Sequence, residues 1–147
     1  MGKKRREGSD SRCCRPEDGP YVWRDYRDPT RQAAVDFETW LQGLAPFARA
    51  HQEGENEDLL EAAARGELKD SGDETTAIKP IVANPEIYEL RRTALSKKLR
   101  FYHGEPSELA LMLVALHRHM KVDGTPQQPE IEFAAARYIQ GRPSSWV

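Results

Sequence analysis

The chain has 147 residues, a formal net charge of −2 and 38% hydrophobic residues, which suits one soluble domain and leaves too little sequence for two domains with separate cores. No apolar run approaches the roughly 20 residues that cross a bilayer, and the basic start lacks the apolar stretch of a secretory signal. A membrane-spanning protein is therefore excluded and a cytoplasmic location is expected. The adjacent Cys13 and Cys14 give no disulfide framework, which fits a reducing compartment.

Charge is unevenly distributed along the chain. Residues 1–24 carry a net charge of +3, residues 25–80 of −7 and residues 81–147 of +2, with three of the four histidines in this last part. A general polyanion-binding protein normally has a larger basic excess. Any contact with nucleic acid is therefore expected from a local patch in the last third, while the acidic middle part could simply keep the protein soluble.

The first 19 residues are polar, charged and interrupted by Gly and Pro. This composition is typical of flexible segments. We therefore expect residues 1–19 to be a disordered basic tail and residues 20–147 to form the folded domain, beginning with a short strand at residues 21–23.

Two helices are predicted after this strand. Asp28 and Pro29 are a favourable N-cap and first helical residue, and apolar residues then recur every three or four positions. Pro46 should kink or end this helix. A second helix is expected to begin near Asn56, with a polar loop at residues 70–76 after it.

The pattern then changes from helical to extended. Residues 86–92, 97–103 and 109–119 predict three strands separated by turn-forming sequences, and residues 109–116 are apolar enough for a strand buried on both faces. A last helix is expected near Pro129. The predicted fold class is α+β: an N-terminal strand and helical pair packed on an antiparallel strand meander, with a C-terminal helix.

Alternation along each strand sorts the side chains of the meander into two faces, provided that no bulge intervenes. An apolar set would pack beneath the helices: Tyr88, Leu90, Leu99, Phe101, Met112, Val114 and Leu116. The basic and aromatic residues are then expected on one open face: Arg91, Lys98, Arg100, Tyr102, His117, His119 and Lys121.

An open face of this kind has the groups that RNA cleavage requires. Attack by the 2′-hydroxyl of RNA needs a base, an acid and cations around the developing phosphorane. Histidine suits proton transfer near neutral pH, Arg and Lys hold phosphate oxygens, and Tyr stacks on a base. His117 and His119 also offer two metal ligands, but no Cys or carboxylate pair completes the set, so no metal and no other cofactor is expected.

Each of these features also has a structural interpretation. Lys97, Lys98 and Arg100 fit a solvated strand face, and the two histidines fit the polar end of a core strand. Their convergence on one predicted face favours the functional interpretation.

Four segments resemble a known family in their order and spacing: IYELRR (87–92), KKLRFYHGEP (97–106), LMLVALHRHMK (111–121) and TPQQPEIEFAAARY (125–138). They are similar to the RelE/HigB-type toxins of bacterial toxin–antitoxin systems, in the phage-derived HigB-like branch. The resemblance implies a small RelE-like domain that cleaves mRNA, often on the ribosome. It also implies a cognate antitoxin as partner, commonly a helix-turn-helix protein.

The resemblance and the residue chemistry together give two sets of candidate residues. The RNA-binding set is Arg91, Arg92, Lys97 and Tyr102. The catalytic set is His117, His119, Lys98, Arg100 and Lys121. The imidazoles are assigned from their chemistry alone, because the family more often has hydrophobic or small residues at these two positions.

Two functional hypotheses follow. The first is a metal-independent mRNA endoribonuclease whose expression arrests growth. The alternative is a catalytically inactive relative that binds a protein partner or RNA without cleavage. It is motivated by the acidic helical pair and by Val122, which stands where the family has a second lysine.

Overall fold

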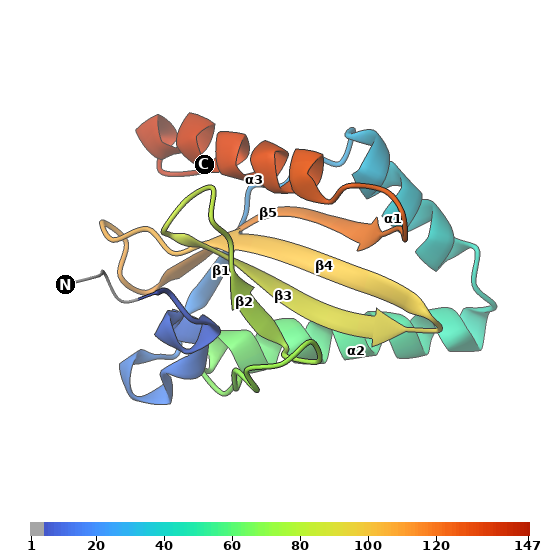
Figure 1. The fold of residues 1–147 in the computed structure, drawn as a ribbon, viewed down its shortest axis with the longest axis horizontal. Coiled ribbons are helices and arrows are strands. Elements are labelled where there is room, and N and C mark those ends of the chain that lie inside the picture. Colours follow the sequence, from blue (N-terminus) through green and yellow to red (C-terminus); the bar gives the residue numbers. More distant parts are fainter. Residues whose placement is uncertain (1–4) are drawn as a thin grey trace.

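A five-stranded mixed sheet in the order β1-β5-β4-β3-β2 forms the centre of the molecule (Figure 1). The computed structural model describes residues 5–147. The strands are β1 (Val22–Asp25), β2 (Ile78–Pro80), β3 (Ile87–Ala94), β4 (Lys97–Gly104) and β5 (Met112–Lys121). The α-helices are α1 (Gln32–Gln42), α2 (Pro46–Ala64) and α3 (Gln128–Gly141). Short 3-10 helices are η1 (Gly8–Asp10), η2 (Arg12–Cys14), η3 (Pro16–Asp18) and η4 (Arg142–Ser144).

The sheet confirms the predicted α+β class and the antiparallel meander of β3, β4 and β5. β1 pairs in parallel with β5, so the apolar β5 is an interior strand. The short edge strand β2 was not predicted; it pairs antiparallel with β3 and contains Pro80, which an edge position tolerates.

The helix boundaries differ from the sequence prediction at both helices of the pair. α1 begins at Gln32, because the Asp28 carboxylate accepts hydrogen bonds from the backbone and hydroxyl of Thr30 and closes a turn before the helix. Pro46 lies after α1 as the first residue of α2, where its missing N–H has no cost. The second helix therefore starts ten residues earlier than Asn56.

Helices cover both faces of the sheet (Figure 1). On the α2 face, Phe37 and Leu41 of α1 pack with sheet residues such as Leu90 and Leu99 in one buried cluster. On the opposite face, Ala134 and Tyr138 of α3 pack in a second cluster with apolar sheet residues. Gly104 permits this close packing, because a Cβ at that position would collide with the ring of Tyr138.

The N-terminal segment is folded, and the expectation of a disordered tail over residues 1–19 is wrong for the part described. Residues 8–18 form the three short helices η1, η2 and η3, and Ser11 and Cys13 are fully buried. The segment is held by distant residues, since the Arg12 guanidinium donates to the carbonyls of Pro106, Leu109 and Met112. Residues 1–4 lie outside the described residues.

A bulge in β5 changes the predicted division between the two faces. Tyr102 pairs with His117 and His103 pairs with Ala115, so Leu116 is an extra residue in β5. Val114 and Leu116 consequently belong to the α3-side core together with Tyr102, and not to the opposite face as predicted.

The turn between β3 and β4 is tight. Leu95 and Ser96 have φ values of 49° and 65°, so two non-glycine residues adopt the left-handed conformation that a two-residue hairpin turn requires. This turn fixes the register that aligns the polar residues of β3 with those of β4.

Candidate basic cleft

The basic and imidazole side chains predicted to share a face do share one, on the α3 side of the sheet. In the register, Arg91 lies opposite Arg100, and Arg100 lies opposite His119. Lys98 lies opposite Lys121 one step further toward the β3–β4 turn. The bulge at Leu116 of β5 lies opposite the step from Tyr102 to His103, outside the segment in which these residues pair, so their alignment is intact.

The inner part of this face is buried, and the expectation of a fully open face is wrong. The exposed fractions of Tyr102, His117 and His119 are 1%, 2% and 3%. α3 and the residue before it, Gln127, contact these side chains from above. The two imidazoles are therefore packed inside the protein.

A continuous hydrogen-bond chain holds His119. The Gln127 amide donates to Glu89 Oε2 at 2.9 Å and to the Tyr102 hydroxyl at 2.6 Å. The Tyr102 hydroxyl lies 2.9 Å from His119 Nε2, and His119 Nδ1 lies 3.2 Å from the Met120 carbonyl. Only a neutral imidazole with its proton on Nδ1 satisfies both contacts when the hydroxyl donates to Nε2.

Electrostatics agree with a neutral ring. Burial and, to a smaller extent, like-charge repulsion from His117 lower the pKa of His119 to about 4. Burial also raises the pKa of Tyr102, so its hydroxyl remains a proton donor. His119 is consequently neutral at physiological pH, with both ring nitrogens occupied.

His117 is held by a different set of contacts. Its Nε2 lies 2.8 Å from Glu130 Oε1, and the same carboxylate accepts from Arg31 Nε at 2.8 Å. The hydrogen bond from Arg31 lowers the pKa of Glu130 to about 2. Burial lowers the pKa of His117 although Glu130 opposes this shift. Glu130 therefore joins α3 to His117 of β5 and to Arg31, just before α1.

Three charged residues form the boundary between the buried and the open part of the face. Arg91 Nε and Arg100 Nε lie 3.2 and 3.1 Å from the same Glu89 oxygen. Neither Nε–H donates a hydrogen bond to any group in residues 5–147, so the two contacts with Glu89 are ionic. Burial raises the pKa of Glu89, and the two guanidinium groups oppose that shift. Glu89 thus neutralises part of the charge where two arginines meet.

Beyond this boundary the face opens into a cleft of about 1620 Å³, which we call the basic cleft. Eight basic residues border it, against the four acidic residues Glu7, Asp70, Asp73 and Glu74. The basic residues are Arg5, Arg6, Lys79, Arg91, Arg92, Lys98, Arg100 and Lys121, although the Arg92 guanidinium itself is bound on the α2 side.

Two members of the predicted RNA-binding set project away from this face. Arg92 alternates to the α2 side, where its guanidinium donates to the side chains of Gln52 and Asn56 at 2.7 and 3.1 Å. Lys97 is exposed at the start of β4 and has the opposite parity to Lys98. Of the alternatives Arg91 and Arg92, only Arg91 lies on the face shared with Arg100 and His119.

Sequence reasoning missed several residues that shape the site. Glu89 could have been found, since it shares the parity of Arg91. Arg5 and Arg6 were assigned to a tail, although the Arg6 guanidinium donates to the carbonyls of Ile81, Asn84 and Ile87. Gln127 precedes a helix and carries no local signal that it would reach across the sheet.

Comparison of the chain with protein-family models, with curated proteins and with solved structures found no match. Across residues 5–147, none of the helices has both the length and the apolar character needed to traverse a bilayer.

Proposed function

We propose that the chain is a RelE/HigB-type toxin that binds mRNA in the basic cleft and cleaves it through the message's own 2′-hydroxyl. The observation that carries the proposal is the placement of Arg91, Lys98, Arg100 and Lys121. These residues come from three adjacent strands, share one sheet face and line one cleft.

The Lys98–Lys121 pair is the strongest part of this argument. Like charges directly opposite each other destabilise a pair of strands, and a single exposed carboxylate, Asp123, lies 3.4 Å from Lys98 Nζ. A bound phosphate would offset the repulsion between the two ammonium groups. Arg91 and Arg100 are the next residues on this face toward the buried part, where both lie against Glu89.

The structure shifts the catalytic proposal from the imidazoles to the lysines. Lys98 and Lys121 line the cleft, whereas Arg100, His117 and His119 are buried, with Arg100 paired with Glu89 and both histidines hydrogen-bonded. We therefore propose that Lys98 and Lys121 contact the reacting phosphate and the ribose 2′-hydroxyl that attacks it. The buried Arg100 adds positive potential from below the cleft surface, while His119 and Tyr102 hold β4 and β5 in position.

A second candidate function, binding of RNA without cleavage, is favoured by the same burial. With both imidazoles buried, the described cleft offers lysines, arginines and four carboxylates, and no accessible histidine. Such a protein would keep the electrostatic surface for phosphate while lacking an efficient proton-transfer group.

The experiment compares the Lys98→Ala, Lys121→Ala double variant with a control that removes the same charge outside the cleft, Lys69→Ala, Lys97→Ala. Growth after induction and cleavage of naked and ribosome-bound message are measured for both. We expect the wild type and the control to arrest growth and cut message, and the cleft variant to lose both activities. A cleft variant as toxic as the control would contradict the site.

Separation of the two candidate functions needs one further measurement. If the wild type leaves both forms of message intact but binds RNA with an affinity that falls steeply with salt, binding without cleavage replaces cleavage as the function. A cognate antitoxin, which the family resemblance implies, would be expected to cover the basic cleft and to compete with that RNA.

A further inference from the structure

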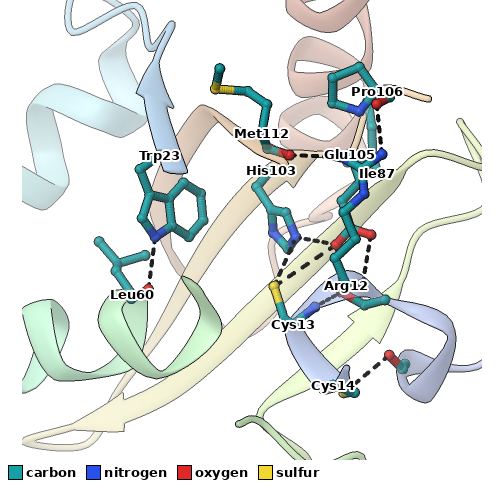
Figure 2. A network of polar contacts seen from close by, with 12 residues as sticks. Arg12, Cys13, Cys14, Trp23, Leu60, Ile87, His103, Glu105, Pro106 and Met112 are labelled. Carbon is teal, nitrogen blue, oxygen red and sulfur yellow. Dashed lines mark hydrogen bonds and ion pairs between the residues drawn. The ribbon is translucent and has the colours of Figure 1, made fainter. Parts of the chain in front are cut away.

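A second polar cluster lies on the α2 side of the sheet, between the N-terminal segment and the end of β4 (Figure 2). It consists of Cys13 from η2, His103 from β4 and Glu105 just beyond that strand. We call it the His103 cluster. The exposed fractions of these three residues are 0%, 1% and 8%, so a thiol, an imidazole and a carboxyl group meet in the interior.

The three donor atoms point at one another (Figure 2). Cys13 Sγ lies 3.4 Å from His103 Nε2, His103 Nε2 lies 2.8 Å from Glu105 Oε2, and Cys13 Sγ lies 3.9 Å from that same oxygen. Around a tetrahedral zinc ion, with bonds of about 2.3 Å to sulfur and about 2.0–2.2 Å to nitrogen and oxygen, such atoms are roughly 3.3–3.6 Å apart. Changes of about 0.5 Å or less would bring all three distances into that range.

Hydrogen bonds alone do not satisfy this cluster, because several groups compete for the same two atoms. His103 Nε2 has one bonding position, yet it faces both the sulfur and the carboxylate oxygen. The Ser11 hydroxyl also approaches Glu105 Oε2, at 2.5 Å. One divalent cation at the centre would replace the competing protons, and its charge would balance a thiolate and a carboxylate beside a neutral imidazole.

The surroundings hold the donor groups in place. The backbone N–H of Arg12 donates to Glu105 Oε1 at 2.9 Å, which leaves Oε2 directed at the cluster. Trp23 packs edge-on against the His103 ring with centroids 5.5 Å apart, and its own N–H donates to the Leu60 carbonyl. Tyr88 stacks on the same imidazole with centroids 6.1 Å apart.

We propose that Cys13, His103 and Glu105 bind a structural Zn²⁺ ion, with the Ser11 hydroxyl or a water molecule held by it as the fourth ligand. A thiolate, an imidazole and a carboxylate are a zinc-type donor set. The ion joins the N-terminal segment to the sheet and thereby fixes Arg5 and Arg6, which form one wall of the basic cleft. This inference is independent of the RNA-cleaving function.

The test uses the full chain, purified without added metal, treated with a chelator and then titrated with Zn²⁺ or Co²⁺ alone. We expect one ion per chain, a thiolate-to-cobalt charge-transfer band with tetrahedral Co²⁺ spectra, and a rise in melting temperature of about 5–10 °C at 100-fold excess of Zn²⁺ over its dissociation constant. A wild-type chain that binds no ion, or shows no thiolate band, would overturn the proposal.

Cys14, which is adjacent to Cys13 in the sequence, provides a matched control. Cys14→Ser should keep the stoichiometry and the cobalt spectrum, because Cys14 Sγ points instead toward the Gly8 carbonyl. Cys13→Ser should abolish the charge-transfer band and weaken Zn²⁺ binding at least 100-fold. Glu105→Gln can still accept from Arg12 and serves as the second variant if Cys13→Ser does not fold. Equal binding by wild type and Glu105→Gln would exclude the carboxylate as a ligand.

Discussion

The α3-side face of the sheet has two parts that differ in exposure although they come from the same strands with the same parity. Tyr102, His117 and His119 lie under α3, and each is hydrogen-bonded to a protein group. Two steps further along, Lys98 and Lys121 line the basic cleft. The extent of α3 decides which part is accessible, so a residue's face alone does not establish that it can reach a substrate.

The two parts of this face therefore have different roles. The buried part stabilises the fold, and the open part is free to bind an anion. Substitutions in the buried part should therefore change the free energy of unfolding, whereas substitutions in the open part should change RNA affinity and leave stability almost unaltered.

The largest effect on stability is expected at the boundary between the two parts, from Arg100→Ala. Its side chain is 5% exposed, and its removal leaves the buried Glu89 carboxylate with Arg91 as its remaining basic partner. The free energy of unfolding should fall by about 3–5 kcal/mol in urea titrations at pH 7. Lys98→Ala is the control, and its free energy of unfolding should change by less than about 0.5 kcal/mol. Similar losses of stability for both variants would show that the buried and open parts do not differ in their contribution to the fold.

The pH dependence of stability should be the next largest effect. The pKa of His119 is lowered in the folded protein to about 4, against about 6.5 when unfolded, so the unfolded chain takes up this proton first. Stability contributed by the neutral ring is therefore present above pH 6.5 and is lost as the pH falls to 4, by an amount on the order of 3 kcal/mol. His119→Gln should flatten the curve in this window, whereas His51→Gln, at an exposed position of α2, should not.

A smaller loss is expected from Tyr102→Phe, which keeps the ring and removes the hydroxyl. His119 Nε2 and one N–H of Gln127 would then lack their partner in a buried position. We expect a loss of about 1–3 kcal/mol in the free energy of unfolding with unchanged RNA affinity. A large loss of RNA affinity at unchanged stability would instead indicate that the tyrosine contacts the message directly.

The smallest effect on stability should come from the exposed lysines, where the readout is the salt dependence of RNA binding. Removing one ammonium group that binds a phosphate should reduce the slope of log affinity against log salt by about 0.7 for a single strand. Lys98→Ala and Lys121→Ala should each show this reduction, and Lys97→Ala should not. Equal slopes for Lys97→Ala and Lys98→Ala would mean that the cleft is not the binding surface.

Alternation along the strands was sufficient to predict the shared face, because β3 and β4 pair without interruption from Ala94 to Tyr88 and the bulge in β5 lies beyond His117. Burial could not be predicted in the same way. It depends on Gln127 and Glu130, which reach the face only after the chain has turned back over the sheet.

The N-terminal segment shows a second limit of local patterns. Its composition is typical of disorder, yet Cys13 and Ser11 are buried by contacts with residues about ninety positions later. No periodicity within residues 5–19 encodes those contacts. The same non-local pairing explains why the two adjacent cysteines gave no sign of the His103 cluster.

The parallel pairing of β1 with β5 has a consequence for synthesis of the chain. Residues 22–25 have their strand partner at residues 112–115, and Cys13 meets a histidine ninety positions downstream. Contacts between such distant segments form late and slowly. A chain emerging from the ribosome therefore has no completed sheet, and no assembled cleft, until residue 121 at the end of β5 has been translated.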